Sequence, residues 1–221
     1  LFDHLLAKGL RLITNPVRFK YCHYLPEWYP ALSHMTVRSV WAEGVPPEMD
    51  ACLSALSCLG SRQVIVKDYV KSWKHDWLDA CFIPETADKK NVCRVINNFV
   101  QAQGTDLNGG VVLRDFLNLR SLGVHPESGM PLSVEFRVFV LGGEVLCTIP
   151  YWPEIATSET LPPEVVLPLL AMDLSPFYTV DFAQTEQGNW VLMEIGDGQV
   201  SGLQGMDPMA FYGSLREKAE R

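Results

Sequence analysis

The sequence predicts an α+β protein of two lobes, in which antiparallel sheets are covered by helices. Segments with helical periodicity alternate with strand-like segments along the 221 residues. Two pairs of strand-like segments enclose short turns that contain glycine, which is typical of antiparallel hairpins. Apolar residues make up 48% of the chain and charged residues 20%, an ordinary globular composition. We expect the division between the lobes near residue 120.

The first half of the chain alternates helical patterns with two strand-like runs. The helical patterns end near glycines such as Gly9 and Gly60, and glycine commonly ends helices. Residues 14–36, which are rich in Tyr, Pro, His and Trp, are expected to be irregular. Helices are predicted at residues 2–8, 47–59 and 87–102, a helical turn at 76–82, and strands at 64–70 and 111–117.

The second half of the chain is richer in strands. Gly142 and Gly143 separate two strand-like runs and are a strong signal for a two-residue hairpin turn. Pro168 is expected to kink or split the helix that follows, and Asp207 is a favourable cap for a final helix. Strands are predicted at residues 134–141, 144–149, 178–183 and 190–195, and helices at 162–172 and 208–219.

The charge balance argues against a surface dedicated to nucleic acid or to anionic membranes. Lys and Arg total 18 and Asp and Glu total 26, so the formal net charge is −8. No apolar run approaches the roughly 18 residues that a membrane span needs. The six cysteines include no CxxC pair, so we expect free and mostly buried thiols in a reducing cytoplasm.

Acidic residues of the second predicted hairpin are the first candidate site. With a turn of about four residues, Asp181 and Glu194 lie nearly opposite each other and point to the same face. Facing carboxylates repel each other, and Mg²⁺ would turn that cost into a binding site. Asp197, in the glycine-rich turn after the strand, is a candidate third ligand. If the register differs by one residue, the acids face solvent separately and Asp197 belongs to a plain turn.

Basic side chains on other strands are candidates for phosphate contacts. Lys67 lies within an otherwise apolar strand, where it either binds an anion or reaches water from a sheet edge. Lys71 follows closely and adds positive charge. Arg137 shares a strand face with Glu135, so it serves either a cross-strand ion pair or a transferred phosphoryl group.

Several common catalytic motifs are absent from the sequence. The chain contains no GxxxxGKS or GxxxxGKT loop, no glycine-rich loop before the lysine strand and no HRD sequence. The stretch from Gly196 to Ser201 approaches the dinucleotide fingerprint but lies late in the chain, in the wrong context. There is also no GxSxG elbow and no convincing Cys–His nucleophile pair.

The order of the remaining motifs resembles that of ATP-grasp enzymes. A strand lysine at Lys67 is followed by a hinge strand VVLRDFL, an arginine strand EFRVFV, an aspartate strand YTVDFA and a glutamate strand WVLMEIGDGQVSGL. More narrowly, residues 10–215 are similar to the ATP-grasp clade named for two arginines and a lysine. The resemblance implies an ATP-grasp fold whose lobes grip a nucleotide. It divides the chain into a remnant of an N-terminal pre-ATP-grasp region (1–45), a small lobe (46–120) and a large lobe (121–221).

The resemblance also implies how the chain would hold ATP. The strand lysine would bind the α- and β-phosphates, and the hinge strand would hold adenine mainly through backbone groups. Arg137 would face the γ-phosphate, and Arg137 and Lys67 would be the catalytic residues. The ATP-binding residues implied in this way are Lys67, Lys71, Arg114, Asp115, Phe116, Leu117 and Arg137.

A metal site is implied as well, with Asp181 and Glu194 as ligands of Mg²⁺. ATP-grasp enzymes end this motif with Glu-x-Asn, whereas Gly196 takes the Asn position here. We therefore expect Asp197 to be the substitute ligand.

The activity implied is ADP-forming ligation of a carboxylate to an amine or a thiol through an acyl phosphate. A peptide or amino-acid substrate is the expectation for this clade. One alternative is an idle nucleotide-binding or interaction module, which the missing Asn favours. Another is a small-molecule kinase that uses the same site. The intact set of lysine, arginine and two acids favours the ligase.

Overall fold

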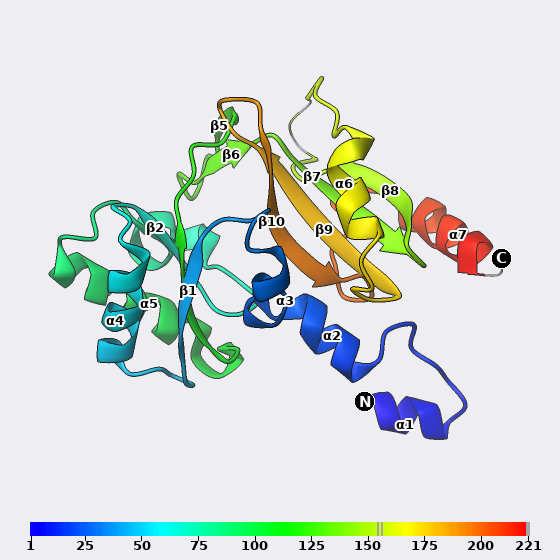
Figure 1. Cartoon of the computed structure of the whole chain (residues 1–221), viewed down its shortest axis with the longest axis horizontal. Coiled ribbons are helices and arrows are strands. Elements are labelled where there is room, and N and C mark those ends of the chain that lie inside the picture. The colour runs from blue at the N-terminus through cyan, green and yellow to red at the C-terminus, as the bar shows by residue number, and fades with distance from the viewer. Residues whose placement is uncertain (154, 156, 220–221) are drawn as a thin grey trace. The chain divides into compact units, whose positions relative to one another are not determined.

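The computed structural model describes residues 1–153, 155 and 157–219, and its chain folds into two units (Figure 1). Each unit is built on a four-stranded sheet whose strand pairs are antiparallel. The predicted α+β class with antiparallel sheets is therefore confirmed. Unit 1 contains Leu1–Ala31, Leu119–Leu122 and Ser133–Arg221, and unit 2 contains Leu32–Asn118 and Gly123–Leu132.

The sheet of unit 2 has the strand order β1–β4–β2–β3, so β4 and β2 are interior strands. Lys67 at the end of β2 pairs with Val112, and Ile65 pairs with Arg114. Because side chains alternate along a strand, Lys67, Ile65, Val112 and Arg114 share one face of this sheet. The strands are β1 (Ser39–Glu43), β2 (Val64–Lys67), β3 (Phe82–Ile83) and β4 (Gly110–Asp115).

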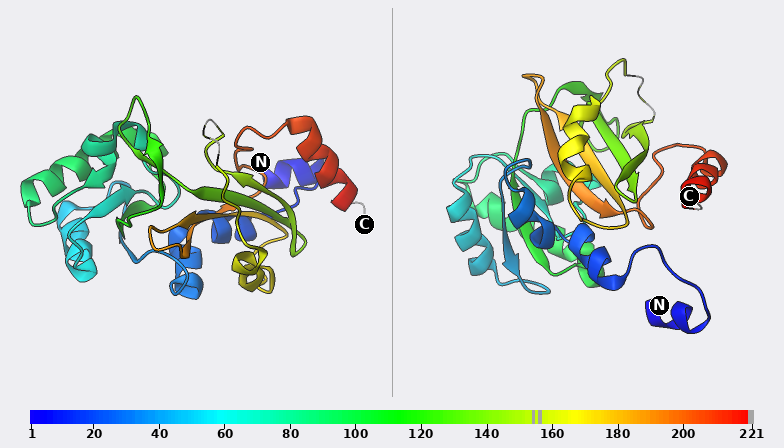
Figure 2. Two further views of the ribbon diagram at one scale, coloured as in Figure 1. Left: turned by 90° about the horizontal axis from the view of Figure 1, so that it is seen from above. Right: turned by 45° about the vertical axis from the view of Figure 1, so that its right-hand side comes forward.

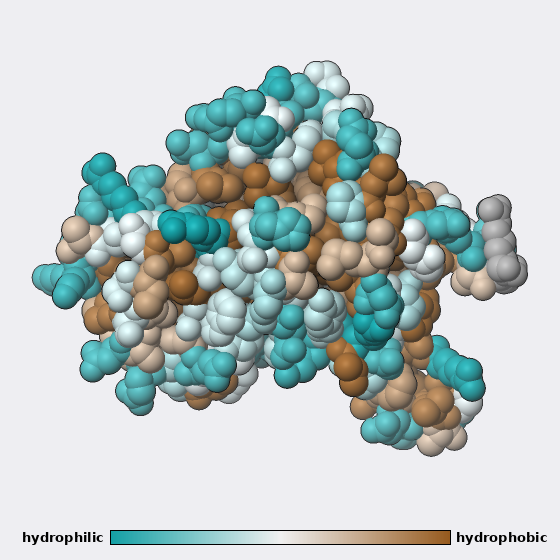
Figure 3. Space-filling view, in the orientation of Figure 1, coloured by the Kyte–Doolittle hydropathy of each residue, from teal (hydrophilic) through white to brown (hydrophobic). Residues whose placement is uncertain are grey.

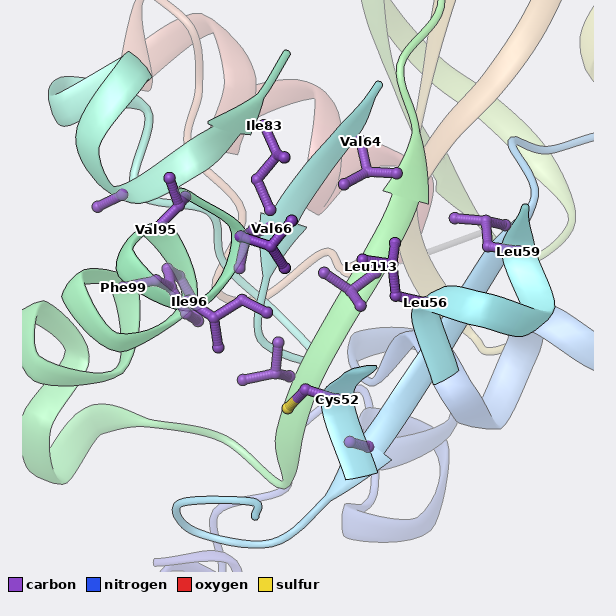
Figure 4. Close-up of a cluster of buried hydrophobic side chains, with 14 of the residues drawn as sticks. Cys52, Leu56, Leu59, Val64, Val66, Ile83, Val95, Ile96, Phe99 and Leu113 are labelled. Carbon is purple, nitrogen blue, oxygen red and sulfur yellow. The ribbon is translucent and has the colours of Figure 1, made fainter. Parts of the chain in front are cut away.

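The opposite face of this sheet forms the core of unit 2. Helices α4 (Met49–Leu59) and α5 (Lys89–Gln103) cover it and supply apolar side chains. Val64, Val66 and Leu113 point into this core from the strands (Figure 4). The buried residues of α5 recur every three or four positions, which gives the helix one apolar face. Both helices therefore form close to their predicted positions.

The sheet of unit 1 has the strand order β10–β9–β7–β8 and consists of the two predicted hairpins. Gly142 and Gly143 form the first turn with φ of +60° and +79°, a conformation that glycine adopts without strain. Five residues (185–189) separate the strands of the second hairpin. The strands are β7 (Glu135–Leu141), β8 (Glu144–Pro150), β9 (Phe177–Gln184) and β10 (Trp190–Asp197).

Helices cover both faces of this second sheet. Helix α7 (Pro208–Ala219) contributes Phe211, which packs on Phe139 and Phe177. Helix α6 (Pro163–Leu170) lies on the other side of the sheet (Figure 2), where the hydroxyl of Tyr178 donates to a carbonyl of the helix. Arg137 and Asp181 lie on the same face as Phe139 and Phe177, because their positions are in phase along β7 and β9.

The prediction that residues 14–36 are irregular is wrong. Helices α2 (Pro16–His23) and α3 (Leu25–Leu32) occupy most of this segment. Asn15 caps α2 by accepting a hydrogen bond from a backbone N–H of the first turn, and proline suits the position after the cap. In α3, Trp28 and Leu32 are buried and lie on an apolar helix face. The sequence pattern did not indicate this face because prolines and other aromatic residues surround it.

Pairing between distant segments creates elements that the local sequence did not indicate. Strand β1 forms because Ser39–Glu43 pairs along β4. Strand β2 ends at Lys67, whereas the predicted strand covered residues 64–70. The remaining elements are α1 (Phe2–Ala7), β5 (Ser121–Val124), β6 (Pro131–Ser133), 3₁₀ turns at Lys74–Asp76 and Gly104–Asp106, and a π-helical turn at Trp77–Cys81.

Hydrophobic and hydrophilic side chains are mixed over the visible surface (Figure 3). Near the N-terminus of unit 1, Leu1, Leu10 and Val17 are exposed. Among the described residues, no helix combines the length and the apolar character needed to cross a membrane.

Burial of cysteines gives a direct test of this fold. All six are free; Cys22 and Cys81 are buried and Cys58 is exposed. Burial raises the pKa of the Cys22 and Cys81 thiols to about 12, so both stay protonated at pH 8, where only a thiolate reacts readily. Titration of the native protein with a disulfide reagent should label Cys58 quickly and these two only after denaturation. Rapid labelling of Cys22 or Cys81 in the native state would contradict the described packing.

Candidate functional site

Three strands of unit 1 place Arg137, Asp181 and Glu194 in one row across the sheet. Arg137 on β7 pairs with Asp181 on β9, and Asp181 pairs in turn with Glu194 on β10. Cross-strand partners of an antiparallel sheet project from the same face. The predicted opposition of Asp181 and Glu194 is therefore confirmed.

A β-bulge is responsible for this register. The turn between the strands has five residues, 185–189, where about four were expected. Without a correction, Met193 would lie opposite Asp181. The register shifts by one residue between Leu192 and Glu194, which brings the glutamate opposite the aspartate.

Arg137 and Asp181 form a buried, two-pronged ion pair. Nε of Arg137 donates to Oδ1 of Asp181 at 2.9 Å, and Nη2 donates to Oδ2 at 2.7 Å. The guanidinium also donates to the carbonyl of Gly202 at 3.1 Å and lies 5.1 Å from the ring centre of Tyr151. Burial alone would lower the pKa of Arg137, but the hydrogen bonds and charge of Asp181 raise it above its usual value. Arg137 is therefore a permanent cation fixed on this face.

Asp181 is almost completely buried beside Glu194. Its side chain is 3% exposed, and its two carboxylate oxygens accept the hydrogen bonds from Arg137. Within the described residues, no three His, Cys, Asp or Glu side chains gather as a metal-binding group. The carboxylates that strand pairing brings together on this face are those of Asp181 and Glu194.

Asp197 does not join this row. It pairs with Tyr178, one position out of phase with Asp181, and so points to the opposite face of the sheet. It is fully buried there, and its Oδ1 accepts from the backbone N–H of Gln199 at 2.9 Å and from Nε2 of that side chain at 3.2 Å. The structure therefore places the expected third metal ligand where it fastens the loop after β10.

Gly196 has a packing reason to be glycine. A Cβ atom at this position would lie 2.8 Å from Oγ1 of Thr179 and 3.0 Å from Oγ of Ser201. These two hydroxyls are hydrogen-bonded to each other at 2.8 Å, and the Ser201 hydroxyl also bonds the carbonyl of Asp197 at 2.8 Å. The space that a side chain at position 196 would need is therefore taken by the hydroxyls of Thr179 and Ser201.

In unit 2, Lys67 and Arg114 lie on the same face of the sheet. Lys67 lies at the end of an interior strand and is only 5% exposed. It is therefore not a solvated lysine at a sheet edge. Arg114 is also buried and donates to the hydroxyls of Ser39 at 3.1 Å and Thr36 at 3.0 Å. Lys71 is exposed in the turn that follows β2.

The expected hinge residues have different surroundings. The Asp115 side chain accepts from Arg38 at 2.8 Å and bonds Ser61, on the core side of the sheet. The backbone N–H groups of Asp115 and Phe116 donate to carbonyls within unit 2, and the Phe116 ring lies 4.7 Å from that of Phe82. An adenine held by this strand would therefore use backbone carbonyls or Leu117 rather than these two N–H groups.

The structure thus forms two clusters of candidate residues, one in each unit. Arg137, Asp181 and Glu194 lie together in unit 1, and Lys67 and Arg114 lie together in unit 2. Sequence reasoning missed the supporting residues. Asp68 directly follows Lys67 in the chain, which is the signal that could have indicated it. Tyr151, which lies against the guanidinium of Arg137, and Thr179, which pairs with Gly196, are brought to the site by tertiary structure.

Comparison with protein families identifies the family of the chain. Residues 58–215 match the model of an ATP-grasp domain, family 3 of the clade named for two arginines and a lysine. The chain belongs to this ATP-grasp family. No curated protein sequence gives a significant match.

Several solved structures share the fold of this ATP-grasp chain at low sequence identity. The ATP-grasp ligase PsnB, complexed with minimal precursor, Mg and ADP, has a TM-score of 0.54 and 14% identity over 97% of this chain. D-cycloserine synthetase DcsG has a TM-score of 0.58 and 14% identity over 97% of this chain and 76% of its own. Cdc123 from Schizosaccharomyces pombe has a TM-score of 0.58 and 14% identity over 93% of this chain and 94% of its own. The chain spans 66% of that PsnB chain.

The position of Asp197 leads to a prediction about stability. Replacing Asp197 with Ala removes the acceptor for two N–H groups of Gln199, so we expect the free energy of unfolding to fall by roughly 1–3 kcal/mol. Urea denaturation measures the change. Glu186→Ala, in the exposed turn of the same hairpin, is the control and should change it by less than about 0.5 kcal/mol. Equal stability of the Asp197 variant and the control would contradict the anchoring role.

Proposed function

We propose that this ATP-grasp chain is a Mg·ATP-dependent, ADP-forming ligase that joins a carboxylate to an amine or a thiol. The observation that carries the proposal is the row of Arg137, Asp181 and Glu194 on one strand face. It combines a permanent cation with two facing carboxylates, which is the set needed to hold a metal–triphosphate complex.

Two residues are proposed as metal ligands, Asp181 and Glu194. Their facing carboxylates are the hard oxygen ligands that Mg²⁺ prefers, and the ion takes its other ligands from water and phosphate. When bound, Mg²⁺ neutralises phosphate charge and helps to align the γ-phosphoryl group. Asp197 is left out of this set because it faces the other side of the sheet.

Cationic side chains are proposed to hold the phosphates. Lys67 and Lys71 bind the α- and β-phosphates, and Arg137 binds the γ-phosphate. The substrate carboxylate oxygen attacks the γ-phosphorus and ADP leaves, which gives an acyl phosphate. The amine then attacks the acyl carbon and inorganic phosphate leaves. Arg137 stabilises the phosphoryl charge in both steps, so the protein needs no nucleophile of its own.

The similar structures support this reaction class. PsnB is a ligase whose structure contains a precursor, Mg and ADP, and DcsG is a synthetase. By this analogy we propose a peptide or amino acid as the carboxylate substrate. The second candidate is a nucleotide-binding module without catalysis, which is favoured by Gly196 at the position of the family Asn.

Calorimetric titration of ATP tests the metal site. We expect the wild-type chain to bind ATP with Mg²⁺ and to lose at least about tenfold in affinity with EDTA, which corresponds to about 1.4 kcal/mol. The double variant Asp181→Asn with Glu194→Gln should bind equally weakly in both conditions, because its side chains are isosteric but uncharged. Glu186→Gln serves as the control.

The result that contradicts the metal assignment is metal-dependent binding that the double variant retains. Asp197→Asn provides a further comparison, since it should keep the dependence on Mg²⁺.

Trapping of an acyl phosphate tests the reaction itself. Wild-type chain, Mg·ATP and mixtures of amino acids or peptides are incubated with hydroxylamine, a small nucleophile that attacks acyl phosphates. A ligase gives ADP, inorganic phosphate and a hydroxamate, and Arg137→Lys should reduce this by about 10²-fold or more because it loses the two-pronged geometry. A stable phosphorylated product without free phosphate would identify a kinase instead. Binding of ATP with no ADP formed would favour the non-catalytic module.

A further inference from the structure

The turn between Lys67 and Lys71 is built around one buried carboxylate. Asp68 is fully buried, and its Oδ1 accepts from the backbone N–H groups of Val70, at 2.6 Å, and of Lys71. Its Oδ2 accepts from the backbone N–H of Asn108 at 3.0 Å and from the Nδ2 of the same residue at 3.2 Å. All four donors are uncharged N–H groups of unit 2.

Backbone hydrogen bonds close this turn, and the two lysines lie at either side of it. The N–H of Asp68 donates to the carbonyl of Lys71 at 2.8 Å, and Lys67 forms an antiparallel bridge with Ser72. The distance between the two lysine Cα atoms is therefore set by the turn. Loss of the carboxylate would free the N–H groups that define this geometry.

The Oδ2 atom of Asp68 connects the turn to the loop before β4 through its hydrogen bonds with Asn108. The N–H of Tyr69 donates to the carbonyl of Asn108 at 3.3 Å. The Tyr69 ring lies where a Cβ of Gly109 would be, with its nearest carbon 2.2 Å from that position. Gly109 has φ of +72°, so glycine is required there both by space and by backbone conformation. The lysine turn and the 108–109 loop are therefore one packed assembly.

We propose that Asp68 is a positioning residue that, through Asn108, fixes Lys67 and Lys71 at the spacing needed to bind the phosphates of a nucleotide. The inference rests on the proposed function, because it takes these two lysines as phosphate ligands. It assigns Asp68 no contact with the nucleotide.

Electrostatics makes this role distinguishable from a simple charge effect. Asp68 carries a negative charge between two cationic residues, so by charge alone its removal should strengthen the binding of an anion. If Asp68 positions the lysines, its removal should instead weaken anion binding, because misplaced lysines bind phosphate less well. The direction of the change therefore decides between the two.

The test compares binding of Mg·ATP and of adenosine to the full chain by calorimetry. In Asp68→Asn, the amide oxygen can still accept from the turn, but the NH₂ group faces the N–H donors of Asn108. We expect Mg·ATP to bind at least about tenfold more weakly and adenosine to bind within about twofold of wild type. Asn108→Ala removes the Nδ2 donor, which bonds Asp68 and also the carbonyl of Asp106, but keeps the backbone N–H bond to Asp68. It should show a smaller loss in the same direction. It also replaces the first variant if that variant does not fold.

Asp88→Asn is the matched control, since Asp88 caps helix α5 of the same unit and the change removes the same charge. It should leave both affinities unchanged. Unchanged or tighter binding of Mg·ATP by Asp68→Asn overturns the inference, and so does an equal loss for Mg·ATP and adenosine, which would indicate a structural role only. If wild-type chain itself fails to bind Mg·ATP, the proposed function fails and the inference fails with it. If the wild-type chain binds Mg·ATP, the proposed ATP binding holds, and the affinities of the variants then test the role of Asp68 alone.

Discussion

The strongest constraint on unit 1 is the placement of two carboxylates opposite each other on a largely buried strand face. Asp181 is 2% exposed and pairs in register with Glu194, an arrangement that repulsion and desolvation make costly. Arg137 offsets part of this cost, and the loop carbonyl of Gly202 and the ring of Tyr151 hold the guanidinium in turn. This face therefore combines a fixed cation with two facing carboxylates, and the proposed metal site rests on that combination.

Strand alternation separates core packing from polar candidate residues in unit 2. There, Val64 and Val66 point into the apolar core, while Lys67 and Arg114 project from the other face. In unit 1, the ion pair of Arg137 and Asp181 shares a sheet face with Phe139, which packs in the apolar cluster under helix α7. Burial of the apolar parts stabilises the sheets, so the polar parts are free to be arranged for ligand binding.

One buried aspartate organises a loop in each unit. Asp68 follows a candidate lysine and gathers four N–H groups, and Asp197 follows a candidate glutamate strand and gathers two from Gln199. Neither side chain is assigned a ligand. A buried carboxylate oxygen that accepts N–H groups of a loop favours one loop conformation, because moving the loop would leave those donors without an acceptor.

The sequence alone determined the local elements: helices α4 and α5 follow from apolar spacing, and the first hairpin follows from Gly142 and Gly143. It also indicated the pairing of Asp181 with Glu194, on the expectation of a turn of about four residues, whereas the turn has five. Only the tertiary structure decided the bulge that establishes this pairing and the opposite face taken by Asp197. Periodicity is encoded by neighbouring residues, whereas register, bulges and strand partners depend on contacts between segments far apart in the chain.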